Sequence, residues 1–299
     1  MKSKSSNVPA AQSPVPAEMS AGMLKFLGIA VLLGLIIWRW NDFITIFVNV
    51  LIWIYDVVGN NFGLAIILFT ILIRIITWPL NAQQMKGAAA MQELQNDKEW
   101  QAVQKKYAKD REKLAQEQMR FYREKGINPF GSCLPTLIQF PIIIALYQSI
   151  TRALGSTPLD LLKLSRSLYS FLDASNLIPL NSNFLWMNLG QPEGIPMPFE
   201  ISFLPYGFPL LALIVAITTY IQAKLTMPAT PSAGGGDQAA AMSNMMSIYM
   251  PLMLGYFALT FPSGLSVYFI TSNLLGIIQY AMQGKANWRN LIPGAAKNK

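Results

Sequence analysis

A single arginine inside a long apolar segment constrains this chain more than any other feature. Arg74 lies in the run FGLAIILFTILIRIITWPL (62–80), which contains no acidic residue. In a helix, Arg74 would lie roughly 18 Å from the start of that run and roughly 9 Å from its end, within one leaflet of a bilayer. Such a charge costs on the order of 2.5 to 3.5 kcal/mol on insertion scales, so it usually faces a protein interior or a wet cavity.

The neighbours of Arg74 indicate a polar helix face. Thr70, Thr77 and Asn81 lie four residues before, three after and seven after Arg74, so the four side chains fall in one line. This stripe favours a water-filled groove over the alternative, in which Arg74 snorkels to the nearer interface.

Composition indicates a polytopic membrane protein and removes most enzyme chemistry. The chain is 53% hydrophobic and 13% charged, and several runs approach the roughly 20 residues that cross a bilayer. It has no histidine and one cysteine, Cys133, which excludes disulfides within the chain, His/Cys metal sites and Ser-His-Asp triads. No carboxylate lies in a spanning run, so we expect neither an enzyme nor a cofactor.

The N-terminal part is predicted to contain three segments. Residues 1–23 form a disordered cytoplasmic tail, and 24–40 form an uncleaved transmembrane anchor. The run 42–58 is short and has a polar side, so we expect an amphipathic helix in the membrane interface; a tilted or short span is the alternative. These segments precede an all-α core at 62–281, with spans at 62–80, 134–154, 206–225, 246–261 and 264–281.

The distribution of basic residues predicts the orientation. The segment 83–132 contains ten Lys and Arg, whereas 155–205 contains only Lys163 and Arg166. The positive-inside rule therefore places 83–132, the N-terminus and the basic tail 282–299 in the cytoplasm. Arg74 then lies in the inner leaflet, and any groove that it lines opens towards the cytoplasm.

The cytoplasmic segment 84–127 reads as a helical hairpin with arms near 84–107 and 110–125. Met91, Leu94 and Val103 on one arm face Leu114, Phe121 and Tyr122 on the other. Its seven acids among ten bases make a poor nucleic-acid surface, so no specific nucleic acid is expected. A solvated charged hairpin and a docking or gating element over the groove both remain open.

Three separated segments carry a family resemblance. INPFGSCLPTLIQFPIIIALYQSI (127–150) resembles the signature of the YidC/Oxa1/Alb3 membrane protein insertases, and FPSGLSVYFITSNLLGIIQ (261–279) resembles their last hairpin. The run 62–80 resembles their arginine-bearing first core helix. The residues that carry the signature are Asn128, Pro129, Gly131, Cys133, Leu134, Pro135, Gln139 and Pro141.

The resemblance implies a five-helix core with a hydrophilic groove, open to cytoplasm and lipid, beside a cytoplasmic hairpin. It implies that Arg74 and Thr70 line this groove, together with Tyr268; Phe269 occupies a position that is often a more polar aromatic residue in the family. Thr77, Gln139, Ser266 and Asn273 are further candidate groove positions, for which ordinary packing between membrane helices is the alternative.

The implied function is a membrane protein insertase and chaperone in a bacterial plasma membrane. Implied partners are nascent membrane proteins, the lipid bilayer, the Sec translocon and, weakly, the ribosome, because the tail 282–299 has only four Lys and Arg. The main alternative is a small-solute (anion) transporter or channel, which predicts internal repeats that the sequence does not show. A passive assembly scaffold is a second alternative.

Overall fold

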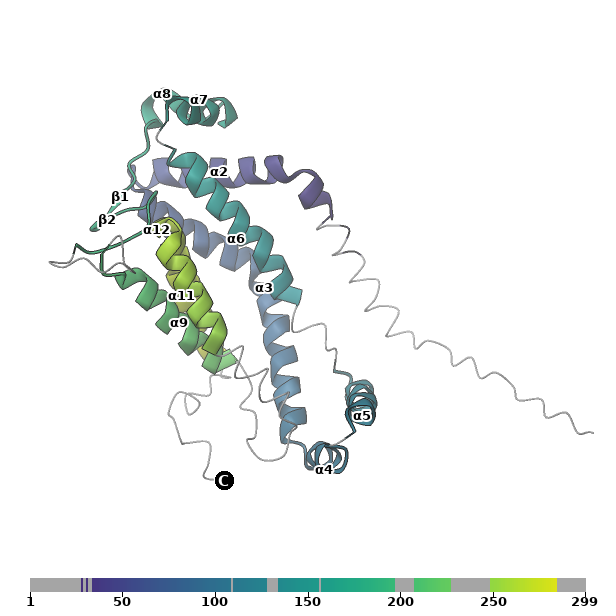
Figure 1. The fold of residues 1–299 in the computed structure, drawn as a ribbon. Helices are drawn as coiled ribbons and strands as arrows, with labels where there is room; N and C mark the ends of the chain where they lie inside the picture. The colour runs from purple at the N-terminus through teal and green to yellow at the C-terminus, as the bar shows by residue number, and fades with distance from the viewer. Residues whose placement is uncertain are drawn as a thin grey trace, which may run out of the picture. The chain divides into compact units, whose positions relative to one another are not determined.

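A computed structural model describes most of the chain as helices (Figure 1). The described residues are 28, 31, 34–108, 110–127, 134–155, 157–196, 207–226 and 248–283. Two compact units, residues 1–43 and 44–299, are described separately. Several predicted segments lie outside the described residues. They are the expected tail 1–23, residues 284–299 of the expected tail 282–299, most of the expected anchor 24–40 and the motif residues 128–133.

Helix α3 (Phe62–Asn96) carries Arg74 and is longer than the sequence suggested. We expected a span at 62–80 and a separate hairpin arm from 84, but one helix continues through both (Figure 1). The segment after residue 80 is rich in Ala and Gln and contains two Met, all of which are strong helix formers, and Pro79 is accommodated inside the helix. The helix stops at Asp97, whose extended backbone ends the hydrogen-bonding pattern.

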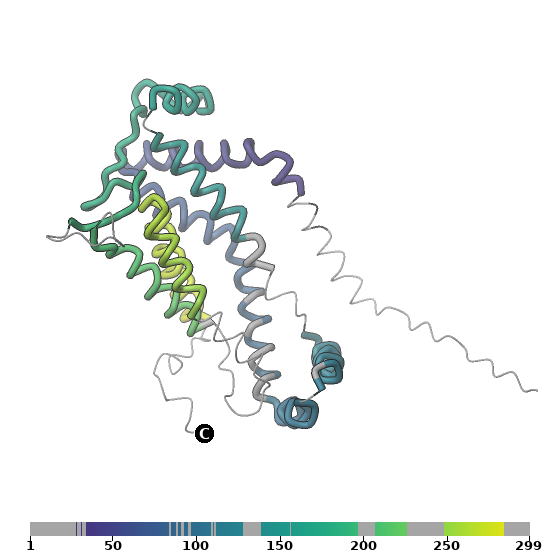
Figure 2. Tube along the Cα trace, viewed as in Figure 1, coloured from purple at the N-terminus to yellow at the C-terminus, as the bar shows by residue number. Residues whose placement is uncertain are grey.

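The helix α12 (Ser263–Met282) lies at the centre of the second unit. It contacts α3, α6 (Leu134–Ala153), α9 (Leu210–Thr226) and α11 (Met250–Thr260). Figure 2 shows α9, α11 and α12 running side by side, while α3 continues beyond them towards the hairpin. Most residues of α12 from 263 to 269 are buried, because neighbouring helices cover it on several sides.

Three described helices are long and apolar enough to cross a membrane. They are Trp40–Val57, Phe62–Gly87 and Ser263–Met282, and two shorter apolar helices are Leu210–Leu225 and Met250–Thr260. The expectation of a mainly helical membrane protein is confirmed. The first of these is α2, which coincides with the segment expected in the interface; its length and composition leave both alternatives open.

The hairpin forms from α4 (Lys98–Lys106) and α5 (Arg111–Glu124), with the end of α3 completing its first arm. Leu94, Trp100, Phe121 and Tyr122 form its buried core, and the rings of Trp100 and Phe121 meet edge to face at 5.4 Å. The expected seam is thus present in part, with Trp100 as an addition and Met91 outside the described side chains.

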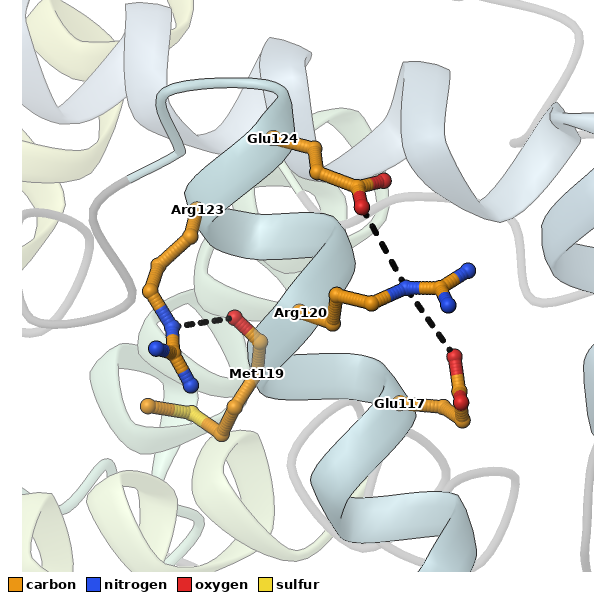
Figure 3. Close-up of polar contacts among 5 residues, drawn as sticks. All are labelled: Glu117, Met119, Arg120, Arg123 and Glu124. Carbon is orange, nitrogen blue, oxygen red and sulfur yellow. Dashed lines mark hydrogen bonds and ion pairs between the residues drawn. The ribbon is translucent and has the colours of Figure 1, made fainter. Parts of the chain in front are cut away.

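The outward face of α5 carries charges that pair within the helix. Figure 3 shows the Arg120 guanidinium between the carboxylates of Glu117 and Glu124, with N–O distances of 3.2 and 3.3 Å, while Arg123 donates to the carbonyl of Met119. Such exposed pairs contribute little to stability. The surface of α5 is therefore a solvated, mixed-charge face.

Asp97 joins three helices at the base of the hairpin. Its backbone N–H bonds the Leu94 carbonyl at the end of α3, its carboxylate accepts from the Glu99 N–H at the start of α4, and it pairs with Lys125 just after α5. The hydrogen bond from Lys125 holds the pKa of Asp97 below its usual value, and the Glu99 N–H acts in the same direction.

Replacing Asp97 by asparagine should loosen the hairpin only when the native carboxylate is charged. Asparagine caps helices as well as aspartate does, so the change removes mainly the charge. Because the folded pKa is depressed, the contribution of the ion pair is complete above the unfolded pKa of about 3.9 and is lost as pH falls through the folded pKa. We expect hydrogen exchange in α4 and α5 to accelerate about two- to fivefold at pH 7. The difference from the native protein should shrink and disappear as the pH falls through the depressed folded pKa of Asp97.

The control is Asp110→Asn, which removes a carboxylate that caps α5 and pairs with Lys113 inside the same helix. Asp110 does not connect to α3, so this variant should affect α5 alone. Equal acceleration in both variants, or a difference from the native protein that does not shrink as the pH is lowered, would contradict the role assigned to the Asp97 charge.

The segment 155–196 has regular structure that the sequence did not reveal. It contains α7 (Pro158–Ser167), α8 (Ala174–Leu177) and a short antiparallel pair, β1 (Asn183–Phe184) and β2 (Met187–Asn188). The segment is fixed to the helices at several points. The Asn181 N–H donates to the Tyr55 hydroxyl of α2, and the Ser263 and Gly264 N–H groups of α12 donate to the carbonyls of Gln191 and Leu189.

A buried carboxylate supports α9 from the same segment. Glu193 is 5% exposed and accepts from the indole of Trp186 at 3.0 Å and from the Leu211 N–H at 3.1 Å. Leu211 lies in the first turn of α9, where N–H groups have no partner within the helix. The segment 181–193 therefore satisfies backbone donors at the starts of both α9 and α12.

Candidate functional site

The site is built around Arg74, which α3 presents to α12. Its Nε donates to the Ser272 hydroxyl at 3.1 Å, and its Nη2 donates to the same hydroxyl at 2.8 Å and to the Ser272 carbonyl. Every ion pair among the described residues is made by a lysine or arginine other than Arg74. The hydrogen-bond acceptors of Arg74 are therefore neutral. Among the described residues, no carboxylate therefore balances the positive charge of Arg74.

A glycine lets α9 and α12 approach Arg74 closely. A Cβ placed on Gly276 would lie 3.2 Å from Arg74 Nη2 and 2.7 Å from Nε2 of Gln222, a residue of α9. Gly276, Arg74 and Gln222 therefore converge from three helices. Small residues commonly mark such close approaches between membrane helices.

A second polar contact joins α6 to α12 near this point. Gln139 donates from its amide Nε2 to the hydroxyl of Tyr268, whose ring is 2% exposed. Tyr268 lies one turn before Ser272 on α12, and its ring centroid is 5.6 Å from that of Phe269. The two resemblance-derived positions Gln139 and Tyr268 are thus brought together, and Phe269 is buried beside them.

The other three polar residues predicted to share a face with Arg74, namely Thr70, Thr77 and Asn81, make their hydrogen bonds within α3. Thr70 is fully buried and donates to the Ile66 carbonyl at 2.6 Å, and Thr77 donates to the Ile73 carbonyl at 2.8 Å. Asn81 donates to the Thr77 hydroxyl at 3.3 Å. In this structure the hydroxyl of Thr70 therefore does not face open space.

The remaining candidates on α12 differ in their surroundings. Asn273 donates to the hydroxyls of Thr218 and Thr219 at 3.1 and 2.8 Å, which fastens α12 to α9. Ser266 is buried, and its hydroxyl has no hydrogen-bond partner among the described residues. Asn273 thus serves helix packing here, whereas the Ser266 hydroxyl has unused bonding capacity.

Sequence reasoning missed three residues that surround Arg74, namely Ser272, Gly276 and Gln222. One signal was available, because Tyr268, Ser272 and Gly276 follow one another at intervals of four residues and so share one face of α12. Nothing in the sequence indicated that this face would meet α3, since that depends on how the helices pack.

Two cavities open elsewhere on the second unit. One, of about 410 Å³, is lined by residues of α7 and α8 including Leu161 and Ala174. The other, of about 300 Å³, lies at the base of the hairpin beside Asp97 and Lys125. Within the part of the chain that the structure describes, no cluster of His, Cys, Asp and Glu could hold a metal ion.

Comparison with known proteins gives a family match over most of the chain. The family model described as 60Kd inner membrane protein matches residues 53–288. A protein named membrane protein insertase YidC from Oceanobacillus iheyensis is 32% identical over 254 residues, which cover 82% of this chain and 84% of that protein.

One more relative and one solved structure are also similar to this chain. Membrane protein insertase MisCA from Bacillus subtilis is 32% identical over 266 residues, 87% of this chain and 85% of the relative. A crystal structure described as an active YidC insertase with its first transmembrane domain resolved is 27% identical, with a TM-score of 0.46. That alignment covers 85% of this chain and 45% of the solved chain.

Proposed function

Because the chain belongs to the YidC/Oxa1/Alb3 family of membrane protein insertases, we propose that it inserts membrane proteins through a polar site centred on Arg74. It is an inner-membrane protein of bacterial type, and its substrates are nascent membrane proteins in a lipid bilayer. Arg74 and the residues around it carry out the insertion step.

The observation that carries the proposal is the environment of Arg74. Three hydrogen bonds from Arg74 end on the hydroxyl and carbonyl of Ser272, which are neutral acceptors. A carboxylate is a stronger acceptor for the guanidinium, because it adds a full negative charge and can accept two parallel N–H bonds from arginine. An acidic client segment that reaches this point would therefore replace Ser272 as the partner of the guanidinium.

The physical problem that the site solves is the passage of a polar tail across hydrocarbon. Each polar group that crosses the roughly 30 Å apolar layer without a partner costs several kcal/mol. We propose an inner-leaflet groove at Arg74, Thr77 and Gln139. The residues buried between helices here would line it when a client separates the helices; they are Thr70, Ser266, Tyr268, Phe269 and Asn273. Such a groove shortens the dry distance, and the Arg74 charge attracts an acidic tail reversibly.

The apolar part of the client follows a different route. It slides along the lipid-facing side of the core helices and partitions into the bilayer, which supplies the main driving force. A membrane potential that is negative inside adds an outward push on acidic tails. This mechanism requires no nucleotide and no cofactor.

The orientation and remaining partners are part of the same proposal. Both termini and the hairpin of α4 and α5 lie in the cytoplasm, where the ten basic residues of 83–132 would reside. There the hairpin meets arriving clients, and the protein works alone or with the Sec translocon, with weak affinity for the ribosome. It also acts as a chaperone for client spans.

Reconstitution tests the function directly. Liposomes that contain the purified protein should protect from protease the N-terminal tail of a single-span client with an acidic tail. Protein-free liposomes should protect much less of it. If the two liposome preparations protect equally, while the protein-containing ones take up a small anion, the chain is a solute transporter and the insertase proposal is wrong.

A further inference from the structure

The helix α7 exposes one face that mixes apolar and basic side chains. Leu159 is 58% exposed and Leu162 is 47% exposed, and Lys163 and Arg166 are exposed beside them. Leu162 and Lys163 are adjacent, and each lies three or four residues from both Leu159 and Arg166, so the four side chains lie on one side of the helix. Tyr169 and Phe171, just after the helix, are also exposed, with ring centroids 5.9 Å apart, and we call these six residues the α7 face.

The rest of the fold holds α7 in a fixed rotation. Leu164, on the opposite side of the helix, is 3% exposed. Asn49 of α2 is buried, and its side chain donates to the Ser167 carbonyl at 2.9 Å and accepts from the Tyr169 N–H at 2.7 Å. The α7 face is therefore presented outward by packing and by two long-range hydrogen bonds.

The connection to α6 keeps this face near the end of a membrane helix. Helix α6 ends at Ala153 and α7 begins at Pro158, so four residues separate them. Four extended residues reach at most about 14 Å. Figure 1 shows α7 beyond the end of α6 and crossing its direction, as a helix on a membrane surface would do.

We propose that the α7 face lies on the outer surface of the membrane and binds anionic phospholipid headgroups. Leu159, Leu162 and the two rings enter the boundary between headgroups and acyl chains, while Lys163 and Arg166 contact phosphate oxygens. Amphipathic helices at interfaces combine these same two contributions. The proposal rests on the orientation proposed above, in which 155–205 lies outside.

Charge complementarity selects lipid as the occupant. Lys163 and Arg166 are the only Lys and Arg in 155–205, and both lie on the α7 face. No ion pair within the described residues joins either of them to a carboxylate. Long basic side chains beside leucines can cover apolar surface with their stems and place their charges among phosphates.

Fluorescence quenching tests the lipid contact in the full-length protein. In a Cys133→Ser background, Leu162→Cys is labelled with the environment-sensitive dye NBD and reconstituted in phosphatidylcholine vesicles with phosphatidylglycerol. Asn176→Cys, exposed on α8 outside the α7 face, is the matched control. Lipids with a doxyl group near the headgroup should quench the label at position 162 several-fold more than the label at 176.

The charges are tested by comparing doxyl-labelled phosphatidylglycerol with doxyl-labelled phosphatidylcholine. Each basic residue near an anionic surface favours it about fivefold, so the native face should prefer phosphatidylglycerol at least fivefold. The double change Lys163→Gln and Arg166→Gln should abolish this preference. The control pair Lys105→Gln and Lys106→Gln, exposed on α4, should leave it intact.

Two results would overturn the proposal. A label at position 162 that iodide quenches freely, and doxyl lipids do not, lies in water. A label protected from both quenchers is covered by protein, such as a second copy of the chain. A membrane-impermeant thiol reagent applied to spheroplasts reports the side of Leu162→Cys separately, so a wrong orientation and a missing lipid contact give different results, independent of insertion activity.

Discussion

Replacing Arg74 by alanine is expected to reduce insertion of a client with an acidic N-terminal tail by at least about tenfold. A hydrogen bond to a charged group contributes about 1.5 to 3 kcal/mol, and 1.4 kcal/mol corresponds to tenfold in rate. Lysine should retain most of the activity, because it keeps the charge although it loses the fork geometry. Protease protection of the tail in proteoliposomes measures the effect.

The controls separate the charge from its location and from folding. Lys86→Ala removes one positive charge from the exposed, hairpin-proximal part of α3 and should leave insertion unchanged. A client with a neutral tail should respond less to Arg74→Ala than the acidic client does. If the alanine, lysine and native proteins insert both clients equally, Arg74 is a snorkelling or hydrating residue and the electrostatic step is wrong.

The second large effect is expected at Gly207, just before α9. Its φ of +101° belongs to a region that residues with a Cβ avoid, and a Cβ there would lie 2.2 Å from the carbonyl oxygen of Ile195. That oxygen accepts the Phe208 N–H at 2.8 Å, in a backbone pair that positions the start of α9. Gly207→Ala must displace this backbone.

We expect Gly207→Ala to destabilise the protein by about 3 kcal/mol or more, from the left-handed backbone and the loss of paired hydrogen bonds. Thermal unfolding in detergent measures the change. The matched control is Gly59→Ala, since Gly59 has a φ of +73° but open space around its Cβ position, and only the backbone term of about 1 to 2 kcal/mol applies there. Equal losses at both glycines would show that the contact with Ile195 is unimportant.

The helical architecture was predictable because membrane helices carry strong local signals. Apolar runs near 62–80 and 264–281 coincide with α3 and α12, since a chain in hydrocarbon must satisfy its backbone within each helix. The helix break that we expected between residues 80 and 84 is absent, because residues 81–96 contain no proline and consist largely of helix formers. The true break depends on Asp97, whose side chain caps α4 and pairs with Lys125.

The candidate site was predictable only in part. Arg74 stood out because a lone cation in an apolar run is costly, whereas Ser272 and Gln222 are ordinary residues of apolar helices. Their importance appears when Arg74 and Gly276 bring α3, α9 and α12 together. Thr70 lies in the expected stripe, yet its hydroxyl is used by its own helix.

By itself, the sequence determined that this chain is a helical membrane protein with Arg74 deep inside an apolar run that has no carboxylate, because hydropathy and charge act locally along the chain. Only the tertiary structure decided what meets that cation, how 155–196 folds over the ends of α9 and α12, and which side of α7 remains exposed. Those outcomes depend on contacts between residues far apart in sequence, such as Arg74 with Ser272 and Asn49 with Ser167, which no local pattern encodes.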